Sequence, residues 1–205
     1  MAKIYLTGKL SDSMLKRGAQ LILKTFGWKA VQEAPVPRSA VMIGAPHTSN
    51  WDFILAMLVL GATGTKAAWV AKHTLFRWPM GMFFRMIGGI PVDRSSGTAF
   101  LKRVIELFKQ DPNLVLAIAP EGTRSKARYW KKGFYIIALK AKVPIVPAYV
   151  DYPKKTVGLG PVIFPTGDLE ADFRNIQSVY KDKIGKYPQN HGEVGVKTIK
   201  SKTES

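Results

Sequence analysis

The chain alternates between short apolar runs and longer stretches whose apolar residues recur at helical spacing. The short runs predict buried strands over residues 40–45, 67–71, 89–92, 114–119 and 144–150, with a further short strand at 161–164. The longer stretches predict helices over residues 13–26, 51–62, 75–86, 97–109, 131–141 and 168–183. Strands that alternate with helices are typical of an α/β fold, with a mostly parallel central sheet flanked by helices.

Composition divides this pattern into three parts. Residues 1–34 include an amphipathic helix, residues 35–183 carry the alternating strands and helices, and residues 184–205 are polar and rich in lysine. The 205 residues suffice for one α/β domain with a sizeable core. A hydrophobic content of 46% with 11% aromatic residues excludes a wholly disordered chain.

Basic residues greatly outnumber acidic ones. There are 31 Lys and Arg against 14 Asp and Glu, which gives a formal net charge of +17. Such a surface attracts polyanions, either nucleic acid or the anionic face of a membrane, and the charge alone does not choose between them. Residues 13–28 favour a membrane, because a basic amphipathic helix with aromatic residues at one end can lie in a bilayer interface. The alternative is an amphipathic helix packed on the core of its own domain.

No apolar stretch is long enough to predict a membrane-spanning helix. The longest candidate, residues 53–61, is too short to cross the hydrocarbon layer, and the N-terminus lacks the pattern of a signal peptide. We therefore expect a cytoplasmic protein, peripheral on the inner face of the cell membrane. The chain has no cysteine, which excludes a disulfide, a thiolate metal site and a cysteine nucleophile. Its three histidines lack ligand spacing, so no metal site is expected.

His47 and Asp52 are the most informative pair of residues. They flank a run of good helix N-cap residues, between the predicted strand 40–45 and the predicted helix 51–62. Five positions on one helix would turn the two side chains apart by roughly 140°. The pair can meet only if His47 lies in the loop and Asp52 in the first helical turn. The arrangement would then be a general base with an orienting carboxylate; the alternative is a capped helix beside an incidental histidine.

A second motif, Pro120-Glu121-Gly122-Thr123-Arg124, begins where the predicted strand 114–119 ends. Glu121 can accept hydrogen bonds from hydroxyl groups, and Gly122 lets a ligand approach the backbone. Arg124 can grip a phosphate with two parallel hydrogen bonds. The alternative is a tight turn with a surface salt bridge between Glu121 and Arg124.

Two further strand ends carry basic residues. Arg94 follows the strand 89–92, and Lys72 follows the strand 67–71. Parallel strands deliver the loops at their carboxyl ends to one edge of the sheet, where α/β proteins bind ligands. Arg94 is therefore a candidate phosphate ligand and Lys72 a weaker one, although Asp93 offers Arg94 a simple ion pair instead.

Together these motifs, with the proline-flanked strand around residues 143–150, resemble the glycerolipid acyltransferases. That family carries H-x-x-x-x-D, a glycine-rich strand ending in arginine, P-E-G-T-R and a V-P-I-V-P strand in this order, and the resemblance spans about residues 40–150. It implies an α/β acyltransferase domain over residues 35–183, with residues 1–34 as a membrane-docking segment. The composition makes residues 184–205 a polar basic tail.

The resemblance also implies the reaction and its partners. A fatty acyl group would pass from a thioester of acyl carrier protein or coenzyme A to the hydroxyl of a lysophospholipid, with 1-acyl-glycerol-3-phosphate as the default acceptor. His47 would be the general base and Asp52 its orienting partner. The substrate-binding residues would be Lys72, Arg94, Glu121, Gly122, Thr123 and Arg124. The expected partners are an anionic membrane surface, the lysophospholipid and the acyl thioester, with no nucleic acid and no cofactor.

Three alternatives remain open at this point. The acceptor can be another lyso-lipid. The pair His47 and Asp52 can instead activate Ser49, Ser125 or a water, as in a lipid or thioester hydrolase. The charge of +17 also fits a non-enzymatic protein that binds polyanions, although that function gives no reason for the pair.

Overall fold

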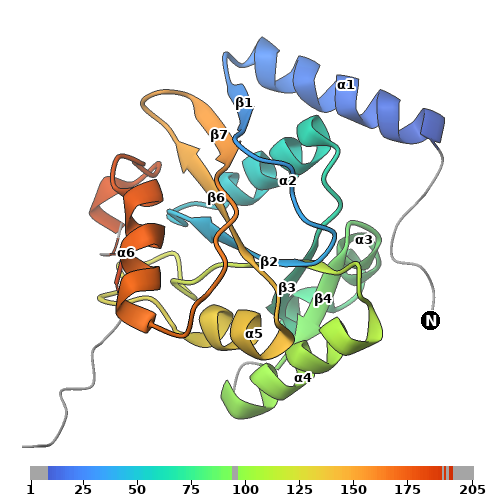
Figure 1. The fold of residues 1–205 in the computed structure, drawn as a ribbon. Helices are drawn as coiled ribbons and strands as arrows, with labels where there is room; N and C mark the ends of the chain where they lie inside the picture. The colour runs from blue at the N-terminus through green and yellow to red at the C-terminus, as the bar shows by residue number, and fades with distance from the viewer. Residues whose placement is uncertain (1–8, 94–96, 191, 193, 196–205) are drawn as a thin grey trace, which may run out of the picture.

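The computed structural model describes residues 9–93, 97–190, 192, 194 and 195. In this part of the chain, seven strands form one sheet in the order β1-β7-β6-β2-β5-β3-β4 (Figure 1). The strands are β1 (Lys29–Gln32), β2 (Ala40–Ala45), β3 (Ala68–Lys72), β4 (Gly89–Val92), β5 (Val115–Ile118), β6 (Ile145–Asp151) and β7 (Thr156–Leu159). The α-helices are α1 (Lys9–Thr25), α2 (Trp51–Thr63), α3 (Met80–Met86), α4 (Gly97–Gln110), α5 (Gly133–Ala141) and α6 (Leu169–Tyr180), with 3₁₀ turns η1 (His73–Phe76) and η2 (Pro188–Asn190).

The centre of the sheet is parallel, as predicted. β2 pairs in parallel with both β5 and β6, β5 pairs in parallel with β3, and β3 with β4. Only the β6–β7 hairpin is antiparallel among the described strand pairs. The carboxyl ends of β2, β5, β3 and β4 therefore lie at one edge of the sheet, in that order. The predicted fold class, a mostly parallel sheet flanked by helices, is confirmed.

Two layers of helices cover the sheet (Figure 1). Met42 and its neighbours on one face pack against Leu55 and Val59 of α2, and α1 covers α2 from outside. Val41 and its neighbours on the other face pack in the core that holds α4, α5 and α6. β2 is buried on both faces, which explains why it reads as a continuous apolar run in the sequence.

Helix α1 packs on the domain and still exposes large apolar side chains. Its small residue Ala19 and its Leu23 are buried against α2, and Gln20 donates a hydrogen bond to the carbonyl of Ala62. A Cβ added to Gly61 of α2 would lie 3.0 Å from the Cβ of Ala19, so the two helices approach closely. The exposed apolar residues of α1 are Met14, Leu15, Leu21 and Ile22, and the exposed Phe26 follows the helix directly. Packing on the core of its own domain is thus confirmed for one side of the helix, whereas its place in a bilayer interface stays a prediction.

Three predicted elements differ from the structure. The strand predicted at 161–164 is wrong, because only Ile163 forms a single bridge, to Ile145, and the hairpin strand is β7. The helix predicted at 75–86 is interrupted, because Pro79 has no N–H to donate and disfavours helical geometry in the residue before it. Strand β1 is absent from the prediction because its four residues are all exposed and show no apolar run.

Residues on both sides of the predicted α/β domain, 35–183, also contact that domain. β1 lies within the segment predicted to dock on a membrane, and it pairs with β7 at the edge of the sheet. The carbonyl of Ile184 accepts a hydrogen bond from the backbone N–H of Tyr152, and the backbone N–H of Tyr187 donates to the hydroxyl of Thr48. Ile184 and Tyr187 therefore contact the segments that follow β6 and β2, respectively. The predicted segment boundaries at 34 and 183 and the membrane-docking role of residues 1–34 stay predictions.

Candidate active site

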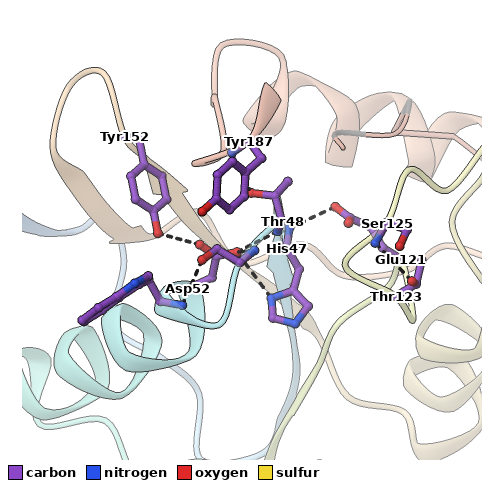
Figure 2. Close-up of polar contacts among 10 residues, drawn as sticks. His47, Thr48, Asp52, Glu121, Thr123, Ser125, Tyr152 and Tyr187 are labelled. Atoms are coloured by element: carbon purple, nitrogen blue, oxygen red, sulfur yellow. Dashed lines mark hydrogen bonds and ion pairs between the residues drawn. The ribbon is translucent and has the colours of Figure 1, made fainter. Parts of the chain in front are cut away.

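The loop between β2 and α2 places His47 and Asp52 side by side. β2 ends at Ala45, α2 begins at Trp51, and Asp52 lies in the first helical turn. His47 Nδ1 is 3.6 Å from Asp52 Oδ2 (Figure 2). The imidazole is about a quarter exposed, whereas the carboxylate is buried. The predicted arrangement of the pair, a loop histidine beside a first-turn aspartate, is confirmed.

Asp52 organises this loop. Its Oδ2 accepts hydrogen bonds from the backbone N–H groups of Thr48 and Ser49, each at 2.7 Å. Asn50 stands at the N-cap position, but its side chain makes no capping hydrogen bond. The first helical turn thus supplies the acceptor for the preceding loop, and the loop is held in a shape that aims His47 at Asp52.

The surroundings of Asp52 favour its anionic form. Burial by itself raises the pKa of a carboxyl group, but the nearby imidazole of His47 and the hydrogen bonds from Tyr152 and the two loop N–H groups outweigh burial and lower the pKa of Asp52 below its ordinary value. A carboxylate that is charged at neutral pH can hold the Nδ1 proton of an imidazole and stabilise the imidazolium.

Tyr152 is a site residue that the sequence did not reveal. Its hydroxyl donates a 2.7 Å hydrogen bond to Asp52 Oδ1, the carboxylate oxygen that faces away from the loop (Figure 2). It follows β6 by one residue, and its ring packs edge-on against Trp28 with centroids 5.2 Å apart. No motif marks this tyrosine, because its contact with Asp52 depends on the pairing of β2 with β6.

Glu121 is the second buried carboxyl group of the site. β5 neighbours β2, so the loop after β5 brings Glu121 to the loop that carries His47. Glu121 Oε1 accepts a hydrogen bond from the backbone N–H of His47 at 3.2 Å, whereas its buried Oε2 has no partner among the described residues. Burial raises the pKa of Glu121 to about 7, in spite of the hydrogen bond from His47. The salt bridge considered between Glu121 and Arg124 does not form among the described residues.

The pKa of Glu121 predicts a pH-dependent stability. Its folded-state pKa of about 7 exceeds the ordinary value of 4.5, so the folded chain holds a proton there that the unfolded chain releases between these pH values. Glu121 therefore lowers stability as the pH rises from 4.5 to 7, by about 3 kcal/mol in all. In urea unfolding, Glu121→Gln should match the unsubstituted chain at pH 4.5 and exceed its free energy of unfolding by about this amount at pH 8.

The control for this experiment is Glu106→Gln, at a half-exposed position of α4 that pairs with Lys109. This substitution should change the free energy of unfolding by less than about 1 kcal/mol at both pH values. An equal free energy for Glu121→Gln and the unsubstituted chain at pH 8 would show that Glu121 ionises freely in the folded protein.

The remaining predicted residues lie around this centre. Gly122 has a positive φ of 68°, a conformation that glycine adopts without strain. Thr123 and Arg124 are exposed on the same loop, and the Thr123 hydroxyl accepts a hydrogen bond from the N–H of Ser125 (Figure 2). Lys72 is exposed at the end of β3, next to β5 in the sheet. Arg94 lies outside the described residues.

The structure therefore brings three predicted residues into one network and leaves the cations at its rim. His47, Asp52 and Glu121 are joined directly or through one backbone group, while the side chains of Arg124 and Lys72 form no ion pair with another described residue. Among the described residues, no group of three or more His, Asp or Glu side chains could hold a metal ion. The arrangement suits proton transfer by an imidazole, beside side chains that can bind an anion.

Residues 29–151, from β1 to the last residue of β6, match the sequence model of the family described as Acyltransferase. The chain belongs to this acyltransferase family. The resemblance to glycerolipid acyltransferases inferred from the motifs is thereby confirmed. The match covers His47, Asp52 and the residues from Glu121 to Arg124, and it ends one residue before Tyr152.

Several curated proteins have sequences similar to that of this chain. A 1-acyl-sn-glycerol-3-phosphate acyltransferase of Cocos nucifera is 36% identical over 107 residues, which are 49% of this chain and 34% of that protein. A protein of the same description from Saccharomyces cerevisiae is 27% identical over 186 residues, 84% of this chain and 59% of that protein. The chain thus spans about a third of the length of the first relative.

A solved structure has the same fold. The crystal structure of the 1-acyl-sn-glycerophosphate acyltransferase PlsC from Thermotoga maritima aligns with a TM-score of 0.58 and 20% identity, over 80% of this chain and 74% of that one. This similarity supports the α/β architecture described above. The roles of individual residues rest on the site geometry.

Proposed function

We propose that the chain transfers a fatty acyl group from a thioester of acyl carrier protein or coenzyme A to the hydroxyl of a lysophospholipid. The favoured acceptor is 1-acyl-glycerol-3-phosphate, which would give phosphatidic acid. The observation that carries this proposal is the His47–Asp52 pair, 3.6 Å apart at the strand edge next to the buried Glu121. The descriptions of the relatives, all 1-acyl-sn-glycerol-3-phosphate acyltransferases, support the choice of acceptor.

In the proposed reaction His47 acts as the general base. Its Nδ1 faces Asp52, which leaves Nε2 for the acceptor. Nε2 takes the hydroxyl proton while the oxygen attacks the thioester carbonyl, and Asp52 stabilises the imidazolium that forms. The tetrahedral intermediate then expels the thiolate, which takes the proton from His47. The products are an ester and a free thiol, and no covalent acyl-enzyme or cofactor is required.

The rim of the site is proposed to bind the acceptor. Arg124, Arg94 and Lys72 would hold the phosphate, because a guanidinium or ammonium group pairs strongly with phosphate oxygens. Glu121 would place the glycerol part near His47, together with Gly122 and Thr123. The pKa of about 7 allows Glu121 to donate or accept a hydrogen bond near neutral pH.

Membrane association is part of the proposal. The net charge of +17 favours an anionic surface, and α1 exposes large apolar side chains among its lysines and arginine. We propose that the protein works on the cytoplasmic face of the cell membrane, where the acceptor lipid resides. Within the part of the chain that the structure describes, none of the helices is long and apolar enough to cross a bilayer.

An acyl-transfer assay tests the proposed function. One acyl-coenzyme A and one acyl carrier protein thioester are each offered with a panel of lyso-lipids, and the products are identified by mass spectrometry. The expected result is an ester product with 1-acyl-glycerol-3-phosphate that exceeds the product with other lyso-lipids. Thioester loss with free fatty acid as the product would indicate a hydrolase instead.

Tyr152 is expected to position Asp52, and Tyr152→Phe tests this role. The substitution removes one hydrogen bond to a charged carboxylate and should lower kcat about tenfold. Because that bond draws charge from Asp52, its loss should strengthen the attraction of the carboxylate for the imidazolium and shift the acidic limb of the kcat–pH profile, which reports protonation of the general base, to higher pH. The matched control is Tyr149→Phe, whose hydroxyl makes a longer 3.4 Å contact with Glu33. An unchanged pH profile in Tyr152→Phe would contradict the proposed positioning role of Tyr152.

A further inference from the structure

The connection between β3 and β4 exposes an unusual number of large apolar side chains. Trp78 is 92% exposed and Met82 is 73% exposed. The other exposed apolar residues of this segment are Leu75, Met80, Phe83 and Met86. A contiguous apolar surface on a folded protein commonly marks an interaction site, whereas singly exposed apolar residues need no explanation.

The inward side of this segment is packed on the domain, around Trp69 of β3. Phe76 stacks on Trp69 with ring centroids 5.9 Å apart, and Phe84 meets the same indole edge-on at 5.7 Å. The indole N–H of Trp69 donates to the carbonyl of Ile87. A Cβ added to Gly81 would lie 2.0 Å from the carbonyl oxygen of Phe76, so η1 and α3 are in close contact. Because these inward contacts fix η1 and α3 on the domain, the exposed side chains of the segment stay directed toward solvent.

The charge of the segment is entirely basic. Residues 72–92 contain Lys72, Arg77 and Arg85 and no aspartate or glutamate. Arg77 and Arg85 form no ion pair with another described residue, and the guanidinium of Arg85 lies 5.4 Å from the ring centre of Phe76. Tryptophan and arginine beside apolar side chains are the composition that favours the boundary between lipid headgroups and acyl chains.

The segment lies in the same layer of the molecule as α1. Phe53 and Met57 of α2 pack against the cluster around Trp69, while another part of α2 packs against α1. Helices α1, α2 and α3 therefore cover one face of the sheet, and α4, α5 and α6 the other (Figure 1). α2 adds two exposed apolar residues to this layer, Trp51 and Ile54.

We propose that η1 and α3 insert into the headgroup layer of an anionic bilayer and form a second membrane contact beside α1. This inference rests on the proposed function, because the insertion presents the carboxyl edge of the sheet to lipid. η1 follows β3 directly, and β3 is separated from β2 only by β5. A bilayer fits better than an acidic protein, because the outward residues are mainly methionine, tryptophan and phenylalanine with no acceptor groups for a polar interface.

Vesicle binding tests this inference. The probe is a vesicle of equal parts phosphatidylglycerol and phosphatidylcholine, and the variant is the double substitution Trp78→Ser with Met82→Gln. Both side chains are largely exposed, so the variant should keep the thermal transition of the unsubstituted chain. Binding should weaken about tenfold or more, since two apolar side chains no longer enter the lipid. The matched control is Phe164→Ser, because Phe164 is 69% exposed and lies near α5, which covers the other face of the sheet. This control variant should bind the vesicles as well as the unsubstituted chain does.

Two further measurements separate the possible outcomes. Phosphatidylcholine brominated on its acyl chains should quench an emission component that Trp78→Phe lacks. Acyl transfer to a short-chain acceptor below its micellar concentration should be equal in the double variant and the unsubstituted chain, because the site itself is unaltered. Undiminished vesicle binding by the double variant overturns the inference, as does weaker binding to acyl carrier protein with vesicle binding intact. Loss of vesicle binding by the variant supports the surface even if the unsubstituted chain transfers no acyl group, in which case the proposed function alone fails.

Discussion

Replacing His47 by alanine is expected to lower acyl transfer by about 10⁴-fold, because it removes the imidazole proposed to take the acceptor's proton. The fold should survive. The imidazole is partly exposed, and the hydrogen bond from this residue to Glu121 comes from the backbone N–H, which alanine retains. The measurement is the initial rate at saturating acyl thioester and lyso-lipid, with the thermal transition recorded in parallel.

Added imidazole provides the control for the alanine substitution. A small molecule that enters the space left by the side chain should restore part of the lost rate, and the restored rate should follow the concentration of neutral imidazole. Near-normal turnover in His47→Ala without imidazole would contradict the assignment of the general base. A lowered rate together with a lowered thermal transition would indicate a structural role instead.

Replacing Asp52 by asparagine is expected to lower acyl transfer by about 10³- to 10⁴-fold, as for the buried aspartate of a serine-protease triad. The amide oxygen can still accept the N–H groups of Thr48 and Ser49, and the amide nitrogen can donate to the hydroxyl of Tyr152 after that hydroxyl rotates. The substitution therefore preserves the shape of the loop and removes the charge that stabilises the imidazolium.

The chain offers a closely matched control for Asp52. Asp172 is also buried, accepts a 2.7 Å hydrogen bond from a tyrosine hydroxyl, that of Tyr135, and accepts the backbone N–H of Thr166 at 2.7 Å. It lies in α6, away from His47. Asp172→Asn should lower stability and leave kcat within a few-fold of the unsubstituted value. Equal losses of kcat in the two variants would mean that Asp52 acts only through the stability of the fold.

The sequence predicts the arrangement of His47 and Asp52 well because the two residues are close in the chain. His47 and Asp52 are joined by one loop, and a single strand-to-helix turn suffices to bring them together. The parallel centre of the sheet can be predicted equally well, because strands buried on both faces have continuous apolar sequences. From these two features the placement of Glu121 at the same edge follows in outline.

The contacts made across the sheet are harder to predict. Tyr152 reaches Asp52 across 100 positions of sequence, through the pairing of β6 with β2 and the turn that follows β6. The turn of Glu121 toward the backbone of His47, away from Arg124, also depends on packing. The interruption of the predicted helix 75–86 at Pro79 was predictable from the sequence, because proline has no N–H to donate within a helix. The prediction missed it because it followed the apolar pattern alone.

Direct transfer from thioester to lipid hydroxyl is the central claim, and rapid mixing of the protein with acyl thioester tests it most directly. The released thiol is measured with and without 1-acyl-glycerol-3-phosphate, at protein concentrations comparable to that of the thioester. The expected result is no thiol release without the acceptor, and release equal to ester formed once the acceptor is present. A burst of thiol equal to the protein concentration without acceptor would reveal an acyl-enzyme, and continuous release would reveal a hydrolase; either result would contradict the claim.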